Sequence, residues 1–137
     1  MIEKIKKEAG LYNACGAIRN IEDLDGLVKL MFEPRGIEFC GENNFPSTEL
    51  LHDIDSEYLK EHNIFVDDPD GYAVNAERVA VYGNSDVFLE YNDPDKRYIV
   101  FVNGGKAHIK AGNWTVVFVF NYRGDIIEEV SDNALIL

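Results

Sequence analysis

Apolar and polar residues alternate in short runs along about the last sixty residues, and a small polar corner separates each run from the next. Alternation at every second residue is typical of β-strands that bury one face. Glycine and asparagine at the corners tolerate the positive φ angles of tight turns. The sequence takes on β character at Ile64–Val66. After it, the pattern predicts strands near residues 79–82, 86–91, 98–102, 107–111, 115–120, 126–130 and 134–137.

The corners recur at a nearly constant interval. The step from Asn84 to Gly105 is nearly equal to the step from Asn113 to Asn133, and a shorter step from Gly105 to Asn113 lies between them. Stacked coils of a short β-solenoid produce a step of about twenty residues, which fits the two longer steps. The hairpins of a twisted antiparallel meander produce similar corners, so both architectures stay open. Asp93-Pro94-Asp95 has the composition of a hairpin tip that interrupts the repeat.

Two of the predicted strands, Tyr98–Val102 and Val116–Phe120, are apolar at every position. Strands of this kind usually have both faces covered by other parts of the protein. We therefore expect these two strands to be central and covered on both sides.

The first half of the chain has helical spacing instead. It predicts a helix from Ile2 that is interrupted at Gly10, a second that Asn20 caps and Pro34-Arg35-Gly36 ends, and two shorter helices after Ser47 and Asp55. The apolar run Ile37–Cys40 is too short to distinguish a strand from a buried connector.

The expected fold class is α+β. A mainly helical N-terminal half, about residues 1–62, is packed on or caps a repetitive β half, about residues 64–137, which is a short β-solenoid or a twisted antiparallel meander. A chain of 137 residues has the size of one ordinary domain. We therefore expect residues 1–137 to form a single domain.

The corner phrases resemble those of known proteins. Val81–Ser85, Lys110–Val116 and Asp132–Leu137 are similar to the Gly/Asn-corner repeats, of the form AYGNATV, of uncharacterised bacterial and phage-associated proteins. The resemblance covers about residues 79–137, and Gly36–Cys40 with Asn44–Ser47 is similar to the segment that precedes such repeats. It implies a repetitive β fold of phage or mobile-element origin, and it carries over no activity and no functional residue.

The charge of the chain bears on its partners. Twenty-five acidic and thirteen basic residues give a formal net charge of −12. Such a charge repels phosphate backbones and anionic membranes and attracts basic surfaces. We expect a basic protein partner, no direct binding to nucleic acid and no membrane binding.

Cellular location is inferred from the cysteines and from the apolar segments. Cys15 and Cys40 are not in a CxxC spacing, and we expect both to be buried and reduced. The first residues lack the apolar run of a signal peptide, and no stretch of eighteen apolar residues is present. The expected location is the cytoplasm.

The residue types that carry most enzyme chemistry do not form a recognisable motif. His52, His62 and His108 lack metal-site spacing, and no nucleophile or phosphate-loop motif accompanies them. His108 lies between Ala107 and Ile109, so it is expected on the face opposite the apolar one. The candidate binding residues are Trp114, His108 and Tyr98, and we expect no catalytic residue and no cofactor. Trp114 follows a corner, where an aromatic either anchors a partner or covers the end of a coil.

One acidic turn is a weak calcium candidate. If Gly71 is the sixth position of a calcium loop, Asp68, Asp70 and Glu77 take the third, fifth and twelfth positions. The first position is then Val66, which has no side-chain oxygen. We therefore expect a solvated turn and no metal.

Three functional classes follow. The first is a non-catalytic interaction module that uses a rigid β surface to bind a basic partner. The alternatives are a small enzyme with its site between helices and sheet, using His62, and a self-assembling protein that pairs through the edge strand Ala134–Leu137.

Overall fold

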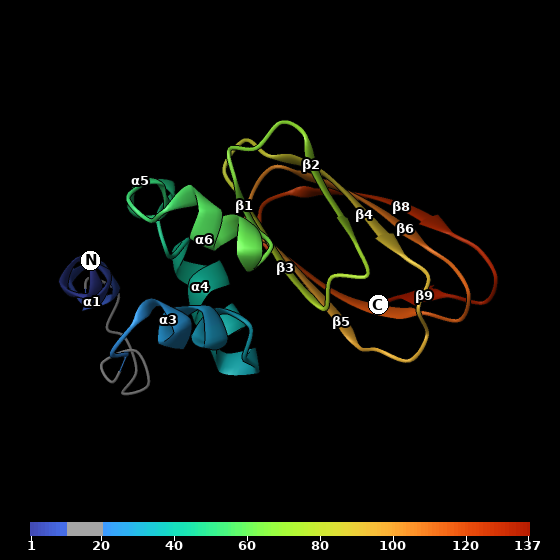
Figure 1. Cartoon of the computed structure of the whole chain (residues 1–137), viewed down its shortest axis with the longest axis horizontal. Coiled ribbons are helices and arrows are strands. Elements are labelled where there is room, and N and C mark those ends of the chain that lie inside the picture. The colour runs from blue at the N-terminus through green and yellow to red at the C-terminus, as the bar shows by residue number, and fades with distance from the viewer. Residues whose placement is uncertain (11–20) are drawn as a thin grey trace. The chain divides into compact units, whose positions relative to one another are not determined.

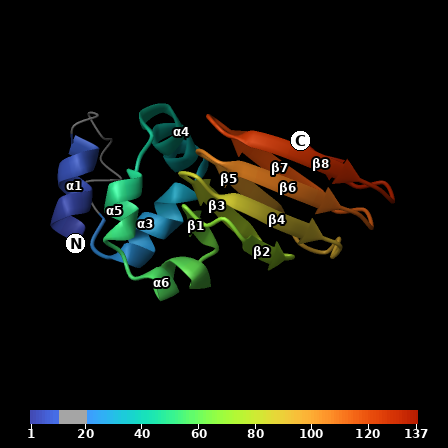
Figure 2. The same cartoon turned by 90° about the horizontal axis from the view of Figure 1, so that it is seen from above.

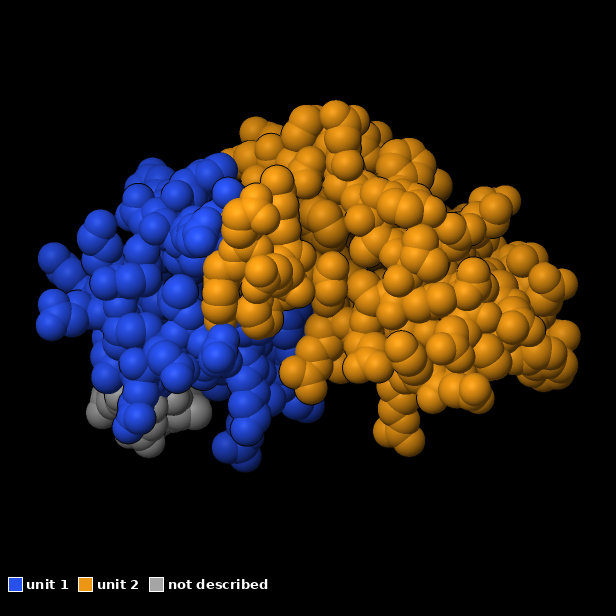
Figure 3. All heavy atoms as spheres, viewed as in Figure 1, with its two compact units in different colours: residues 1–56 blue, residues 57–137 orange. Residues whose placement is uncertain are grey.

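A computed structural model describes residues 1–10 and 21–137. They divide into two compact units, residues 1–56 and residues 57–137 (Figure 3). The first unit is helical in its described part and the second is mainly β, as the sequence predicts. The predicted single domain over residues 1–137 stays a prediction.

Unit 1 is built from short helices. Asp23 caps α3 (Leu24–Met31), because its carboxylate accepts a hydrogen bond from the Gly26 backbone N–H at 2.8 Å. The helix therefore starts at Leu24, and the predicted cap at Asn20 is wrong. Asn20 itself, like Cys15, lies outside the described residues. Within residues 1–10 and 21–56, the helices of this unit are α1 (Ile2–Gly10), α3 (Leu24–Met31), α4 (Pro34–Asn43) and α5 (Thr48–His52).

Residues 34–40 differ from the sequence prediction. Pro34 follows the end of α3, but it also occupies the first turn of α4, where proline is well tolerated. The run Ile37–Cys40 is therefore the middle of a helix, and a strand or connector there is wrong. A Cβ on Gly36 would lie only 1.6 Å from the Leu30 carbonyl oxygen, so this close approach of the two helices needs a glycine.

A carboxylate connects α1 to the start of α5. Glu8 accepts hydrogen bonds from both the backbone N–H and the hydroxyl of Ser47. The same hydroxyl accepts the Leu50 N–H at 3.1 Å and so caps α5. The predicted helix start at Ser47 is confirmed.

Unit 2 consists of a short helix followed by a β-solenoid. The helix α6 (Ser56–Glu61) matches the prediction, and Asn63 takes a left-handed φ of 56° after it. The strands are β1 (Ile64–Val66), β2 (Gly71–Val74), β3 (Arg78–Tyr82), β4 (Asp86–Tyr91), β5 (Tyr98–Val102), β6 (Lys106–Ala111), β7 (Val116–Asn121), β8 (Asp125–Val130) and β9 (Leu135–Ile136). The seven strands predicted from sequence match β3 to β9 within one residue at each end, and the β structure predicted at Ile64–Val66 is β1. Only β2 was not predicted.

The strands form two parallel sheets that the chain visits in alternation. Sheet A has the order β1-β3-β5-β7-β9 and sheet B the order β2-β4-β6-β8 (Figures 1 and 2). Paired residues are one coil apart in sequence, as in the series Ile64, Ala80, Phe101 and Phe120, in which each residue pairs with the next. The solenoid is thus confirmed and the antiparallel meander is wrong. The predicted hairpin at Asp93-Pro94-Asp95 is wrong as well, because this segment joins β4 of sheet B to β5 of sheet A.

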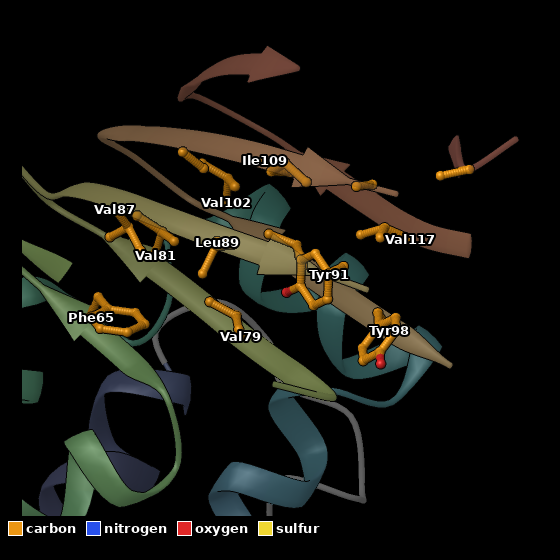
Figure 4. Close-up of a cluster of buried hydrophobic side chains, with 14 residues drawn as sticks. Phe65, Val79, Val81, Val87, Leu89, Tyr91, Tyr98, Val102, Ile109 and Val117 are labelled. Carbon is orange, nitrogen blue, oxygen red and sulfur yellow. The ribbon is translucent and has the colours of Figure 1, made fainter. Parts of the chain in front are cut away.

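The core of unit 2 lies between the two sheets. Alternate residues of each strand point inward, among them Val81, Leu89, Val102 and Ile109 (Figure 4). The prediction of central, covered strands holds for β5, in which all residues but the half-buried Ile99 are buried. It is wrong for β7, because the outward residues Phe118 and Phe120 are exposed.

Asparagines stack at the corners that lead from sheet B back to sheet A. The Asn75 amide donates to the Asn92 side-chain oxygen at 2.7 Å, and the Asn113 amide donates to the Asn92 carbonyl at 2.9 Å. Asn75 and Asn113 also have positive φ. The corner asparagines therefore close each turn and bond it to the next coil, so the corner pattern in the sequence has a direct physical cause.

Two tyrosines whose rings are in contact in the core, Tyr91 and Tyr98, permit a prediction about stability. The Tyr98 hydroxyl donates to the Asp93 carbonyl at 2.7 Å, whereas the buried Tyr91 hydroxyl has no hydrogen-bond partner among the described residues. Burial accordingly raises the pKa of Tyr91. We expect Tyr91→Phe to raise the free energy of unfolding by about 1 kcal/mol, because an unsatisfied polar group is removed, and Tyr98→Phe to lower it by about 1 kcal/mol. Urea denaturation of the two variants checks this, and a loss of stability in Tyr91→Phe would contradict it.

Candidate binding face on the outer side of sheet B

The outer side of sheet B, called here the outer B face, displays a column of large side chains. Tyr72, Phe88, His108 and Ile127 are paired in register across β2, β4, β6 and β8. Their neighbours along each strand point into the core, so these four point away from it. Tyr72 is 63% exposed and Phe88 is 51% exposed. The face therefore presents aromatic surface to solvent.

Charged side chains flank this column. On one side the registered row is Val74, Glu90, Lys110 and Glu129, and on the other it is Asp86, Lys106 and Asp125. The outer B face thus carries four carboxylates, two lysines and one histidine. At neutral pH its local charge is negative.

Specific contacts hold the column in place. The Tyr72 hydroxyl donates to Glu90 Oε2 at 3.0 Å. The rings of Phe88 and His108 stack with 4.0 Å between centroids and 7° between planes. Phe88 packs on the face of the His108 ring, and Asp86 Oδ1 lies 3.0 Å from the ring nitrogen Nε2. The contact with Asp86 therefore also orients the imidazole. Contacts between neighbouring strands therefore hold the rings of Tyr72, Phe88 and His108 in fixed orientations.

The Tyr72–Glu90 contact has an electrostatic consequence. The hydrogen bond to the Glu90 carboxylate, and then its negative charge, raise the pKa of Tyr72 above the usual 10.0. A raised pKa means that the neutral phenol is favoured in the folded state. This contribution is present below pH 10 and is lost as the pH rises through the raised pKa. At neutral pH, Tyr72 therefore remains a donor and holds Glu90 in place.

A hollow of about 260 Å³ opens on the outer B face. The central column and the row that contains Glu90 surround it, chiefly through Tyr72, Phe88, Glu90, Lys110 and Glu129. Small-molecule pockets are typically about 300–1,000 Å³ and bury most of their ligand. The hollow is therefore slightly smaller than a typical small-molecule pocket and has room for one or two amino-acid side chains.

The three predicted binding residues do not lie together. His108 is on the outer B face, as the alternation predicts. Trp114 is 66% exposed at the corner between β6 and β7, with a left-handed φ of 65°. Tyr98 is buried in the core between the sheets. Of the three, only His108 belongs to the outer B face.

The weak calcium candidates have other partners. Asp68 Oδ1 accepts the backbone N–H of Asp70 at 2.9 Å, and Glu77 lies 3.8 Å from the ammonium of Lys96. Across residues 1–10 and 21–137, no three His, Cys, Asp or Glu side chains gather in a way that could hold a metal ion. His62, predicted for the enzyme alternative, bonds through Nδ1 to the Tyr58 carbonyl oxygen at 2.9 Å.

Most of the outer B face was not predicted from the sequence. Phe88 lies between the apolar residues Val87 and Leu89 in the strand predicted near residues 86–91, so its outward direction follows from the alternation in that strand. Tyr72 lies in β2, which was not predicted. The usable signal is that large side chains recur once per coil on the outward positions of successive sheet B strands: Tyr72, Phe88, His108 and Ile127.

No family model, curated protein or solved structure matches the chain. The observed repeat region is a short parallel β-solenoid over residues 64–136. In the part of the chain that the structure describes, no helix is long and apolar enough to cross a membrane.

Proposed function

We propose that this chain is a non-catalytic protein-interaction module whose outer B face binds a basic, extended segment of a partner protein. The proposal rests chiefly on one observation, the hollow between exposed aromatic rings with Glu90 and Glu129 beside it. An arginine or lysine side chain that enters the hollow would meet both a carboxylate and the face of a ring.

The charge distribution supports a basic partner. Residues 57–137 contain fourteen acidic and seven basic residues, so unit 2 attracts cationic segments at long range. On the face itself, Asp86, Glu90 and Glu129 provide acceptors for close contact. Long-range attraction raises the association rate, and close pairing with the carboxylates gives specificity.

The alternative of a small enzyme has less support. The Asp86–His108 pair resembles the part of a catalytic site that orients a general base. However, the hydroxyl that precedes Asp86 in sequence, Ser85, is buried, donates to the Tyr82 carbonyl at 2.8 Å and accepts the Asp68 N–H. It is therefore engaged in structure and is not placed to act as a nucleophile.

The biological setting forms part of the same proposal. The Gly/Asn corners resemble those of phage-associated proteins, and we propose on this ground that the chain originates from a phage or mobile element. An acidic module of that origin would act in the cytoplasm by occupying a basic surface of a host protein.

Fluorescence anisotropy with labelled peptides tests the binding proposal. The probe is a ten-residue peptide that alternates arginine and leucine, and the control replaces each arginine with glutamate. We expect the basic peptide to bind with a micromolar Kd that rises at least fivefold between low and physiological salt, because the attraction is screened. Equal binding of both peptides, or no binding of the basic one, would overturn the proposal.

A further inference from the structure

The outer side of sheet A differs in character from the outer B face. Paired across β5, β7 and β9 lie six outward apolar residues, called here the apolar A face: Ile99, Val116, Phe118, Phe120, Leu135 and Leu137. The six include no charged or polar side chain. Phe118 is central, because Ile99 and Leu137 lie beside it on the neighbouring strands and Val116 and Phe120 lie two residues away on its own strand.

Much of this face is open to solvent. Phe118 and Phe120 are each 38% exposed, and both leucines are more than half exposed. Trp114 and Tyr122 adjoin it at the two ends of β7 and are exposed as well. The four aromatic side chains alone therefore expose on the order of 400 Å². A patch of that size is as large as the largest on a typical monomer and marks an interaction site.

We propose that the apolar A face binds the same face of a second copy of this chain, forming a symmetric dimer. A net charge of −12 on each copy opposes self-association wherever acidic residues would meet. The apolar A face is a broad surface on which two copies meet without juxtaposing charges. With the flanking leucines and the strand edges, its area approaches the roughly 800 Å² per partner of a standard interface.

The geometry suits a two-fold arrangement. Two sheets that pack face to face lie about 10 Å apart with their strands within about 30° of each other. Around a two-fold axis near Phe118, the phenylalanines of β7 would pack against Ile99, Leu135 and Leu137 of the second copy. This isologous arrangement closes the assembly at two copies.

The open end of the stack is less suited to pairing. On the last coil, two positions that continue inward columns of the core are polar: Asn121 is paired with Val102 and Glu128 with Ile109. Asn121 closes its own turn by accepting the Gly124 N–H at 2.9 Å. Inward charges on an edge strand prevent another strand from adding to it. Association through the apolar A face therefore has the advantage over addition of a strand to β8, the edge strand of sheet B.

The test is sedimentation velocity of the full chain over a range of concentrations, with three variants. The wild type should reach twice its mass of 15.5 kDa at micromolar concentration. Phe118→Glu and, independently, Leu135→Glu should each raise the dimer Kd at least thirtyfold while circular dichroism stays native. The control is Ile127→Glu, which places the same charge on a residue 47% exposed on the outer B face and should leave the dimer Kd unchanged.

Salt separates this dimer from the peptide complex proposed above. Screening reduces the repulsion between two acidic copies, so added salt should strengthen the dimer, whereas it weakens binding of the basic peptide. A wild type that stays monomeric, a dimer that Phe118→Glu and Leu135→Glu leave intact, or a dimer lost equally in Ile127→Glu would each overturn the inference. Because Phe118 is not on the outer B face, Phe118→Glu should still bind the basic peptide.

Discussion

Replacing Gly105 with alanine is expected to lower the free energy of unfolding by about 3 kcal/mol or more. Gly105 has φ of +76°, which costs an alanine about 1–2 kcal/mol. A Cβ there would lie 2.5 Å from the carbonyl oxygen of Ser85 and 2.9 Å from its nitrogen, both of them backbone atoms that cannot rotate away. The clash adds the cost of overpacking, about 1–3 kcal/mol.

The backbone of Gly105 also takes part in hydrogen bonds between successive coils. Lys106 N–H donates to the Ser85 carbonyl, and Asp125 N–H donates to the Gly105 carbonyl, both at 2.9 Å. A displaced Gly105 would strain both hydrogen bonds and loosen the contact between successive coils. Since the stability of a solenoid depends on contacts between neighbouring repeats, the effect should spread beyond one turn.

Gly112→Ala is the matched control, because Gly112 is also a corner glycine of the solenoid. A Cβ there would meet only the Ser131 hydroxyl at 3.2 Å and an Asp132 carboxylate oxygen at 3.9 Å, both on side chains that can move. We expect a change below about 1 kcal/mol. Urea unfolding followed by circular dichroism compares the two variants, and similar losses in both would contradict the role of Gly105.

The strands could be predicted because the alternation of apolar and polar residues shows which side chains are buried. This alternation is the same whichever strand pairs with the one in question. In β6, Ala107 and Ile109 are buried and His108 between them faces outward, as the sequence predicts. Strand direction was not predictable in the same way. Asparagine and glycine supply positive φ at a hairpin and at a solenoid corner alike, so Asn113 does not distinguish them.

The outward faces of the two sheets are harder to predict from the sequence than the strands themselves. An apolar run such as Val116–Phe120 predicts burial of both faces, but sequence does not say whether the cover comes from the same chain. The outer B face is harder still, because Tyr72, Phe88 and Ile127 become neighbours only through pairing of successive coils. The coils also differ in length, since the first is several residues shorter than those that follow, and this variation conceals the register in the sequence.

Reversing both glutamates beside the hollow, Glu90→Lys with Glu129→Lys, should weaken binding of the alternating arginine–leucine peptide about a hundredfold. Each reversal replaces an attraction by a repulsion, and about 1.4 kcal/mol per site corresponds to tenfold in Kd. Glu90 also loses its hydrogen bond from Tyr72, so the ring beside the hollow is released. Both side chains point away from the core, Glu129 exposed and Glu90 half-buried, so the fold should be retained.

The matched control reverses two acids of unit 2 that lie off the face, Glu61→Lys with Asp95→Lys. Glu61 is in the last turn of α6, where a lysine is well tolerated, and Asp95 is in the β4–β5 corner. Both double variants have the same net charge, so they change long-range attraction alike. If Kd rises much more for the Glu90 and Glu129 pair, binding depends on the local carboxylates. If the two pairs weaken binding equally, only overall charge attracts the peptide, and the outer B face is not its binding site.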